Sequence, residues 1–161
     1  MVEGAGVMRA YDGIKAERGV NMESPDFLER SRQLLAKNDS VQICMSGGSM
    51  RPTIEDGDMV IIEPIADGKI NQGDVVLYQS RYDTAVIHRV IKIERASGEK
   101  TITTRGDASS HNDLSVTIDK ILGRVKNIER AGESIKVSRP NKSFSIWLLN
   151  FWKRLKFWTN E

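Results

Sequence analysis

Hydrophobic residues follow a strand-like pattern over the middle of the chain. From residue 41 onward, short runs rich in Val and Ile are separated by Gly, Asp and Asn, which is the composition of β-strands joined by turns. This pattern predicts strands at about 41–45, 59–63, 74–79, 85–94, 100–105, 121–129 and 134–138, with turns at Asp56-Gly57, Asn71-Gln72-Gly73, Ser97-Gly98 and Ala131-Gly132. We therefore expect residues 41–138 to form one mainly β domain.

The first 40 residues have a different pattern. Residues 1 to about 22 are rich in Gly and charge without periodicity, so we expect a flexible lead-in. Ser24-Pro25-Asp26 then matches the start of a helix, with Ser24 as the N-cap and Pro25 at the first helical position. This short helix is expected to end near Lys37.

The C-terminal segment, residues 139–161, contains all three tryptophans. On a helical wheel six apolar side chains share one face, namely Phe144, Trp147, Leu148, Phe151, Leu155 and Trp158. Three cationic residues, Lys153, Arg154 and Lys156, interrupt the apolar run, so we predict an amphipathic helix rather than a spanning one. Either this face contacts a membrane or membrane protein peripherally, or it packs on the β domain of its own chain.

Composition narrows the class of protein. A chain of 161 residues is long enough for one domain, and a net charge of +2 does not indicate a nucleic-acid partner. The single cysteine, Cys44, excludes an internal disulfide and a Cys-rich zinc site, and we expect it to be buried. Because charges occur throughout the first 40 residues, we expect no signal peptide or membrane anchor there. We expect a cytoplasmic protein, with peripheral membrane contact if the C-terminal helix binds lipid.

The stretch MSGGSMRPT, residues 45–53, is the first that suggests chemistry. It places Ser49 between paired glycines and a proline, where a strand must turn sharply. Gly47 and Gly48 leave room for a substrate backbone and let main-chain N–H groups face a developing oxyanion. Together with Met50, these glycines are our candidate substrate and oxyanion residues. A plain Gly-Ser turn would have the same sequence.

Two later stretches supply the partners that a nucleophilic serine needs. His88 lies in the otherwise β-branched run AVIHRVI, although a lone strand histidine is often only a core residue. Asp107 and Asp113 lie in the polar loop that follows the strand at 100–105. A carboxylate beside His88 would hold its tautomer and stabilise the imidazolium. The alternative is that Gly106-Asp107 is a turn and Asp113 is merely solvated.

Taken together, these motifs resemble the type I signal peptidase superfamily, which includes the self-cleaving SOS-type repressors. The His-Arg-Val order resembles the archaeal and endoplasmic-reticulum branch, whose base is histidine. In that branch the triad aspartate follows a Gly-Asp by six residues, as Asp113 follows Asp107. The motifs are Ser49-Met50-Arg51-Pro52, Gly57-Asp58, Gly73-Asp74, His88-Arg89-Val90 and Gly123-Arg124-Val125.

The resemblance implies a serine endopeptidase that cleaves a peptide or precursor protein, without metal or organic cofactor. Ser49 would be the nucleophile, His88 the general base and Asp113 its orienting carboxylate. Family members often carry a serine two places before the nucleophile as an oxyanion donor, but this chain has Gly47 there. Two alternatives stay open: a self-cleaving regulator cut near Ala5-Gly6, and an inactive peptide-binding module.

Overall fold

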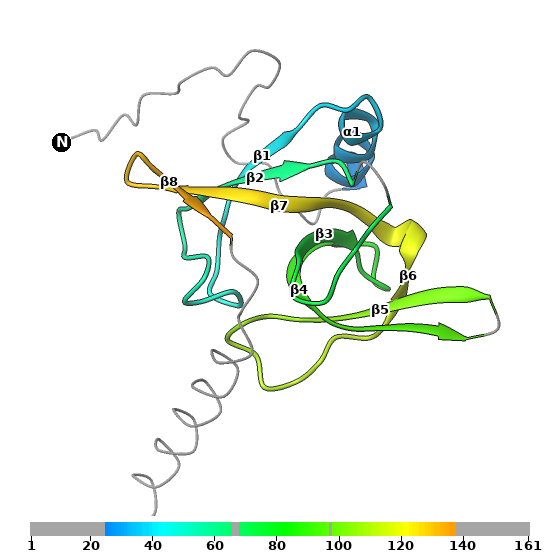
Figure 1. The fold of residues 1–161 in the computed structure, drawn as a ribbon. Helices are drawn as coiled ribbons and strands as arrows, with labels where there is room; N and C mark the ends of the chain where they lie inside the picture. The colour runs from blue at the N-terminus through cyan, green and yellow to red at the C-terminus, as the bar shows by residue number, and fades with distance from the viewer. Residues whose placement is uncertain (1–24, 66–67, 97, 138–161) are drawn as a thin grey trace, which may run out of the picture.

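The computed structural model describes residues 25–65, 68–96 and 98–137. Within these ranges the chain forms one α-helix and eight strands in a single antiparallel sheet, which is strongly curled (Figure 1). The elements are α1 (Pro25–Ala36), β1 (Val41–Cys44), β2 (Met59–Glu63), β3 (Val75–Gln79), β4 (Ala85–Ala96), β5 (Glu99–Arg105), β6 (Val116–Thr117), a 3-10 turn (Ile118–Lys120), β7 (Ile121–Arg130) and β8 (Glu133–Lys136).

The strand order is β1-β2-β7-β3-β4-β5-β6, and β8 also pairs with β7. Long-range pairing between β2 and β7, and between β3 and β7, joins the two ends of the domain. Register shifts at Ile61/Ile62 in β2 and Leu77/Tyr78 in β3 interrupt both pairings with β7. Such bulges bend a strand and increase its twist, and they accompany the strong curl of the sheet.

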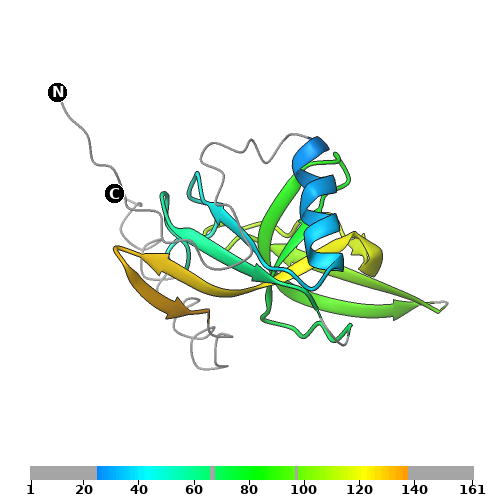
Figure 2. The same ribbon diagram turned by 90° about the horizontal axis from the view of Figure 1, so that it is seen from above.

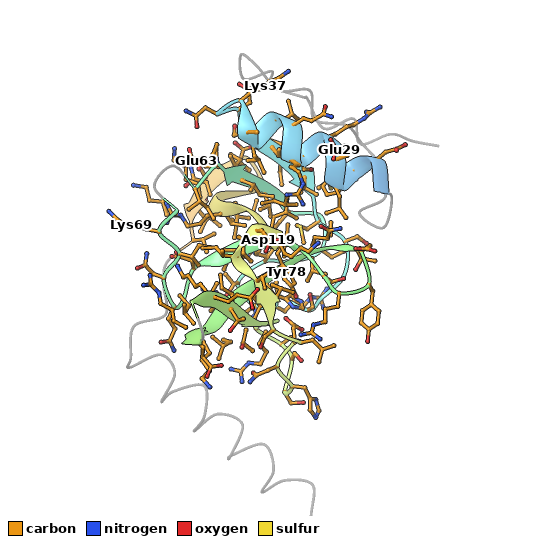
Figure 3. The ribbon with its side chains drawn as sticks, turned by 90° about the vertical axis from the view of Figure 1, so that its right-hand side faces the viewer. Glu29, Lys37, Glu63, Lys69, Tyr78 and Asp119 are labelled. Atoms are coloured by element: carbon orange, nitrogen blue, oxygen red, sulfur yellow. The ribbon has the colours of Figure 1, made fainter. Side chains whose placement is uncertain are left out.

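The central strand β3 is buried on both faces, because the curled sheet encloses it. Side chains alternate across a strand, so Val75 and Leu77 join one apolar cluster while Val76 and Tyr78 join another. Two-sided burial explains why β3 is a continuous apolar run rather than an alternating one. Figure 3 shows Tyr78 in the interior of the domain, while Glu29 on α1 and Lys37, directly after the end of α1, lie at its surface.

Helix α1 lies beside the β1-β2-β7 part of the sheet (Figure 2) and buries Phe27, Leu28 and Leu35 in the first cluster. Gly123 in β7 allows this close packing. A Cβ at that position would lie 2.7 Å from Ile62 Cγ2 and 3.1 Å from Leu35 Cδ1. The glycine of the Gly123-Arg124-Val125 motif therefore has a packing role.

The structure confirms the predicted mainly β fold, and every predicted strand is present with ends within two residues. The two-residue strand β6 was not predicted. The expectation for Cys44 was wrong: it is exposed, because Val41 and Ile43 take the inward positions of β1 and leave Cys44 facing out. Three predictions, the lead-in, the Ser24 N-cap and the C-terminal amphipathic helix, lie outside the described residues. No helix within the described ranges is long and apolar enough to span a membrane.

Candidate active site

Ser49 lies on the loop between β1 and β2, and two buried side chains fix this loop to the domain. Met50 and Ile54 are each only 2% exposed and belong to the main apolar cluster. At the base of the loop, the N–H of Met45 donates to the Asp58 carbonyl at 2.8 Å, and the N–H of Gly57 donates to the Met45 carbonyl at 2.9 Å. The side chain of Met50 thus anchors the loop, while its neighbour Ser49 is exposed.

The two glycines before Ser49 have different environments. Gly47 has a φ of 97°, a backbone conformation that favours glycine, and its N–H donates to Asp56 Oδ1 at 2.8 Å. The Gly47 N–H therefore already has an acceptor. Gly48 lies beneath the side chain of Arg51. Within the described part of the chain, the N–H of Ser49 donates no hydrogen bond.

The structure brings Ser49, His88 and Asp113 into one hydrogen-bonded row. His88 Nε2 lies 3.1 Å from Ser49 Oγ, and His88 Nδ1 lies 2.7 Å from Asp113 Oδ2. The His88 side chain is 14% exposed and that of Asp113 is 26% exposed, so both are partly buried beside the exposed Ser49. These are the contacts that nucleophile, base and orienting carboxylate require.

Two further side chains bind the same oxygen of Asp113. Tyr78 Oη donates to Oδ2 at 3.1 Å, and Thr104 Oγ1 donates to it at 2.8 Å. Burial acts to raise the pKa of Asp113, but the hydrogen bonds from His88, Thr104 and Tyr78 and the charge of His88 outweigh burial and hold the pKa below its usual value. Burial also raises the pKa of Tyr78 far above its usual value, so Tyr78 stays a hydrogen-bond donor.

Asp107 and Asp113 have different hydrogen-bond partners. Its carboxylate accepts two hydrogen bonds from Arg89, at 2.7 Å from Nε and 2.6 Å from an Nη atom, and a third from Thr53 Oγ1. Arg89 is only 6% exposed, so this bidentate pair is largely buried. Within the described residues, no hydrogen bond joins Asp107 to Ser49 or His88. Asp107 therefore ties its own loop to β4 and, through Thr53, to the nucleophile loop.

Successive residues of β4 thus hold the two ends of the loop after β5. His88 binds Asp113, and Arg89 binds Asp107, on opposite faces of the strand. The same loop contacts the nucleophile directly, because the N–H of Ala108 donates to the Ser49 carbonyl at 2.9 Å. Strand pairing and loop anchoring together place three distant parts of the sequence at one site.

The two Gly-Asp motifs form the same turn ahead of β2 and β3. Asp58 Oδ2 accepts the N–H of Glu55 at 2.8 Å, and Asp74 Oδ2 accepts the N–H of Asn71 at 2.9 Å. Both carboxylates are buried. Arg130 binds Asp58 with two hydrogen bonds, at 2.9 and 2.7 Å. These aspartates therefore stabilise the turns that directly precede β2 and β3.

No role was assigned from the sequence to four residues that support the site, namely Thr53, Tyr78, Arg89 and Thr104. Tyr78 and Thr104 lie inside strands, where the pattern indicates only core. Arg89 had a signal, because an arginine inside the β-branched run of β4 needs a buried carboxylate partner or an exposed face. Among the described residues, no group of three or more His, Cys, Asp or Glu side chains is arranged to hold a metal ion.

A model of the family described as Peptidase S24-like matches residues 10–126, which include Ser49, His88, Asp107 and Asp113. The chain belongs to the Peptidase S24-like family. The match spans α1, β1 to β6 and the first six residues of β7, so the whole candidate site lies within the shared family region.

Curated relatives of this S24-like protein include signal peptidases. It is 26% identical over 133 residues to the signal peptidase complex catalytic subunit SEC11 of Clavispora lusitaniae, covering 76% of this chain and 80% of that one. The SEC11 subunit of Lodderomyces elongisporus is 27% identical over 154 residues, covering 89% and 92%. Signal peptidase I W of Bacillus subtilis is 30% identical over 74 residues, but these are only 45% of this chain and 39% of that protein.

Proposed function

We propose that this S24-like protein is a serine endopeptidase that cleaves a peptide or a precursor protein. The observation that carries the proposal is the hydrogen-bonded row of Ser49, His88 and Asp113. His88 Nε2 lies 3.1 Å from Ser49 Oγ, and His88 Nδ1 lies 2.7 Å from Asp113 Oδ2. Similarity to signal peptidases supports precursor proteins as the substrate class.

In the acylation step, Ser49 Oγ attacks the carbonyl carbon of the scissile bond and His88 Nε2 takes the hydroxyl proton. Asp113 holds the N–H at Nδ1 and stabilises the imidazolium that forms. When the tetrahedral intermediate collapses, His88 returns the proton to the leaving amine, and the acyl group stays on Ser49. A water molecule then attacks the ester with His88 as base, which releases the acid product and restores Ser49.

The oxyanion of each intermediate needs a hydrogen-bond donor near Ser49, and the backbone N–H of Ser49 supplies it in this proposal. The N–H of Ser49 donates to no described residue, so it is available to an oxyanion. The Gly47 N–H is engaged by Asp56 at 2.8 Å. Gly47 therefore contributes through the backbone conformation that it gives the loop rather than through its own N–H.

An extended substrate fits the open edge of the sheet. β1 is the terminal strand of the sheet order and pairs only with β2 within the described residues. The nucleophile loop continues directly from β1, so a peptide added along β1 would run toward Ser49. Addition of a peptide strand to a sheet edge gives main-chain hydrogen bonds without requiring a particular sequence.

The test is cleavage by wild type, Ser49→Ala and Ser46→Ala, measured by mass spectrometry on the intact chain and on a peptide pool. Ser46 is the matched control, because it is an exposed serine on the same loop. We expect Ser46→Ala to retain activity and Ser49→Ala to lose it with unchanged thermal stability, since one exposed hydroxyl adds little packing. Equal cleavage by wild type and Ser49→Ala would refute the proposal.

The same measurement separates the two alternatives from this proposal. Ser49-dependent loss of an N-terminal piece from the chain itself would indicate a self-cleaving regulator. Peptide binding without any cleavage, together with no reaction of Ser49 with an acylating probe, would indicate a binding module.

A further inference from the structure

Arg51 lies beside the nucleophile with its charge exposed. It follows Ser49 by two residues and is an exposed side chain. Its Cδ and Nε lie 3.4 Å from where a Cβ on Gly48 would stand, so the side chain covers the residue directly before Ser49. The N–H of Arg51 donates to the Gly48 carbonyl at 3.1 Å, which closes the turn and fixes where the side chain begins.

The acidic residues of the same loop are engaged by other groups. Asp58 and Glu55 both pair with Arg130, at 2.7 Å and 3.1 Å, and Asp56 accepts the N–H of Gly47. The structure pairs the Arg51 guanidinium with no carboxylate of the described residues. Among the described residues, its positive charge therefore has no carboxylate partner next to the point where a substrate must lie.

We infer that Arg51 is a specificity-determining residue that binds a carboxylate of the substrate close to the scissile bond. The substrate class is an acidic peptide segment, with Asp or Glu at one position within a few residues of the cleaved bond. A guanidinium offers paired N–H donors that match a carboxylate. The inference rests on the proposed endopeptidase activity, because it places the recognised carboxylate relative to the bond that Ser49 attacks.

The expected preference is modest, because Arg51 is exposed. An exposed ion pair contributes little and is screened by salt, although a bidentate carboxylate contact is stronger. We expect Asp or Glu to be favoured about threefold to tenfold over other residues at one position. The preference should shrink as the salt concentration rises.

The experiment profiles cleavage of a chymotryptic peptide pool from denatured cell protein by mass spectrometry. Wild type is compared with Arg51→Glu and with Arg95→Glu, a control that changes net charge equally. Arg95 is exposed on β4 and lies opposite Lys100 of β5, at the far end of that hairpin from the nucleophile loop. We expect acidic enrichment at one position for wild type and Arg95→Glu, and its replacement by Lys and Arg enrichment for Arg51→Glu.

A second readout does not need turnover. Immobilised Ser49→Ala and the double variant Ser49→Ala/Arg51→Glu are given the same pool, and the retained peptides are sequenced. Enrichment of acidic peptides on the first variant only would support the inference even if cleavage failed, in which case only the proposed function would fall. Ser49-dependent cleavage with equal acidic preference in wild type and Arg51→Glu would overturn the inference alone. Equal acidic enrichment on both immobilised variants, or none on either, would overturn it as well.

Discussion

Gly106 lies directly against the main chain of Ser49. A Cβ placed on Gly106 would stand 2.6 Å from the Ser49 carbonyl oxygen and 3.1 Å from His88 Nε2. Both neighbours belong to the candidate site, and the first is a backbone atom that cannot swing aside. A side chain at position 106 must therefore push the loop after β5 away from the nucleophile loop.

We expect Gly106→Ala to lower both stability and activity. Forced overpacking costs about 1–3 kcal/mol, and a shift of about 1 Å between reacting groups lowers a rate by about a hundredfold. The control is Gly48→Ala, whose Cβ would meet only the Arg51 side chain at ordinary contact distance and should keep the free energy of unfolding within about 0.5 kcal/mol of wild type. Urea unfolding and peptide cleavage check this, and a fully stable, fully active Gly106→Ala would contradict it.

Asp113 and Asp107 should respond differently to the same substitution. Asp113→Asn loses the carboxylate that binds His88 Nδ1, so we expect turnover to fall by about a thousandfold or more with the fold retained. Asp107→Asn weakens the buried pair with Arg89, so we expect a loss of about 2 to 4 kcal/mol of stability and a smaller effect on rate.

The two variants serve as controls for each other in thermal unfolding and steady-state kinetics. If Asp107→Asn lowered the rate much more than Asp113→Asn at unchanged thermal stability, the assignment of the orienting carboxylate would be wrong.

The fold was predictable where local pattern and tertiary environment agree. β2, β4 and β7 each carry several Val and Ile residues near turn residues such as Gly or Asp, and each forms a strand within two residues of the predicted bounds. β6 has two residues, which is too short for any periodicity, and it exists only because β5 supplies its partner. The orientation of Cys44 depends on which face of β1 meets the core, which a four-residue strand does not specify.

The site was predictable as a set of residues but not as a set of contacts. The family resemblance of the motifs singled out Ser49, His88 and Asp113, but only the curled sheet places Tyr78 and Thr104 around the same carboxylate. For Asp107 the sequence offered, as the alternative to a site role, only a turn at Gly106-Asp107. The structure shows side-chain partners instead, because strand pairing brings the buried Arg89 beside it.

The hydroxyl of Thr104 should control the ionisation of Asp113. Removing its hydrogen bond with Thr104→Val takes away one of the interactions that hold the pKa of Asp113 down, so this pKa should rise. Tyr78→Phe removes the weaker contact, at 3.1 Å, and should raise the pKa less. The measurement is the pH titration of the Asp113 side-chain carboxyl carbon by NMR.

Thr103→Val is the matched control, because the Thr103 hydroxyl binds Ser115 rather than Asp113. It makes the same chemical change one residue away on the same strand. An unchanged Asp113 titration in Thr104→Val, or an equal rise in Thr103→Val, would show that the hydrogen bond to Thr104 does not set this pKa.

Asp58 should make the stability of the domain sensitive to acid. The hydrogen bond from Arg130, aided by the Glu55 N–H and the charge of Arg130, lowers the pKa of Asp58 even though burial acts to raise it. A carboxylate with a lowered folded-state pKa stabilises the fold above its unfolded pKa of about 3.9, and that contribution is lost as the pH falls through the folded-state pKa. Asp58→Asn should therefore be less stable than wild type at pH 7, and the difference should narrow below about pH 4.

Urea unfolding of wild type and Asp58→Asn from pH 7 down to pH 2.5 checks this expectation. Glu133→Gln is the control, since Glu133 is an exposed carboxylate on β8. Its plot of the free energy of unfolding against pH should run parallel to that of wild type. The turn that Asp58 stabilises also holds the start of the nucleophile loop, because the Asp58 carbonyl accepts a hydrogen bond from the N–H of Met45. Cleavage by Asp58→Asn at pH 7 should therefore fall along with its stability. A difference between wild type and Asp58→Asn that stayed constant down to pH 2.5 would show that the ionised pair with Arg130 does not stabilise the fold.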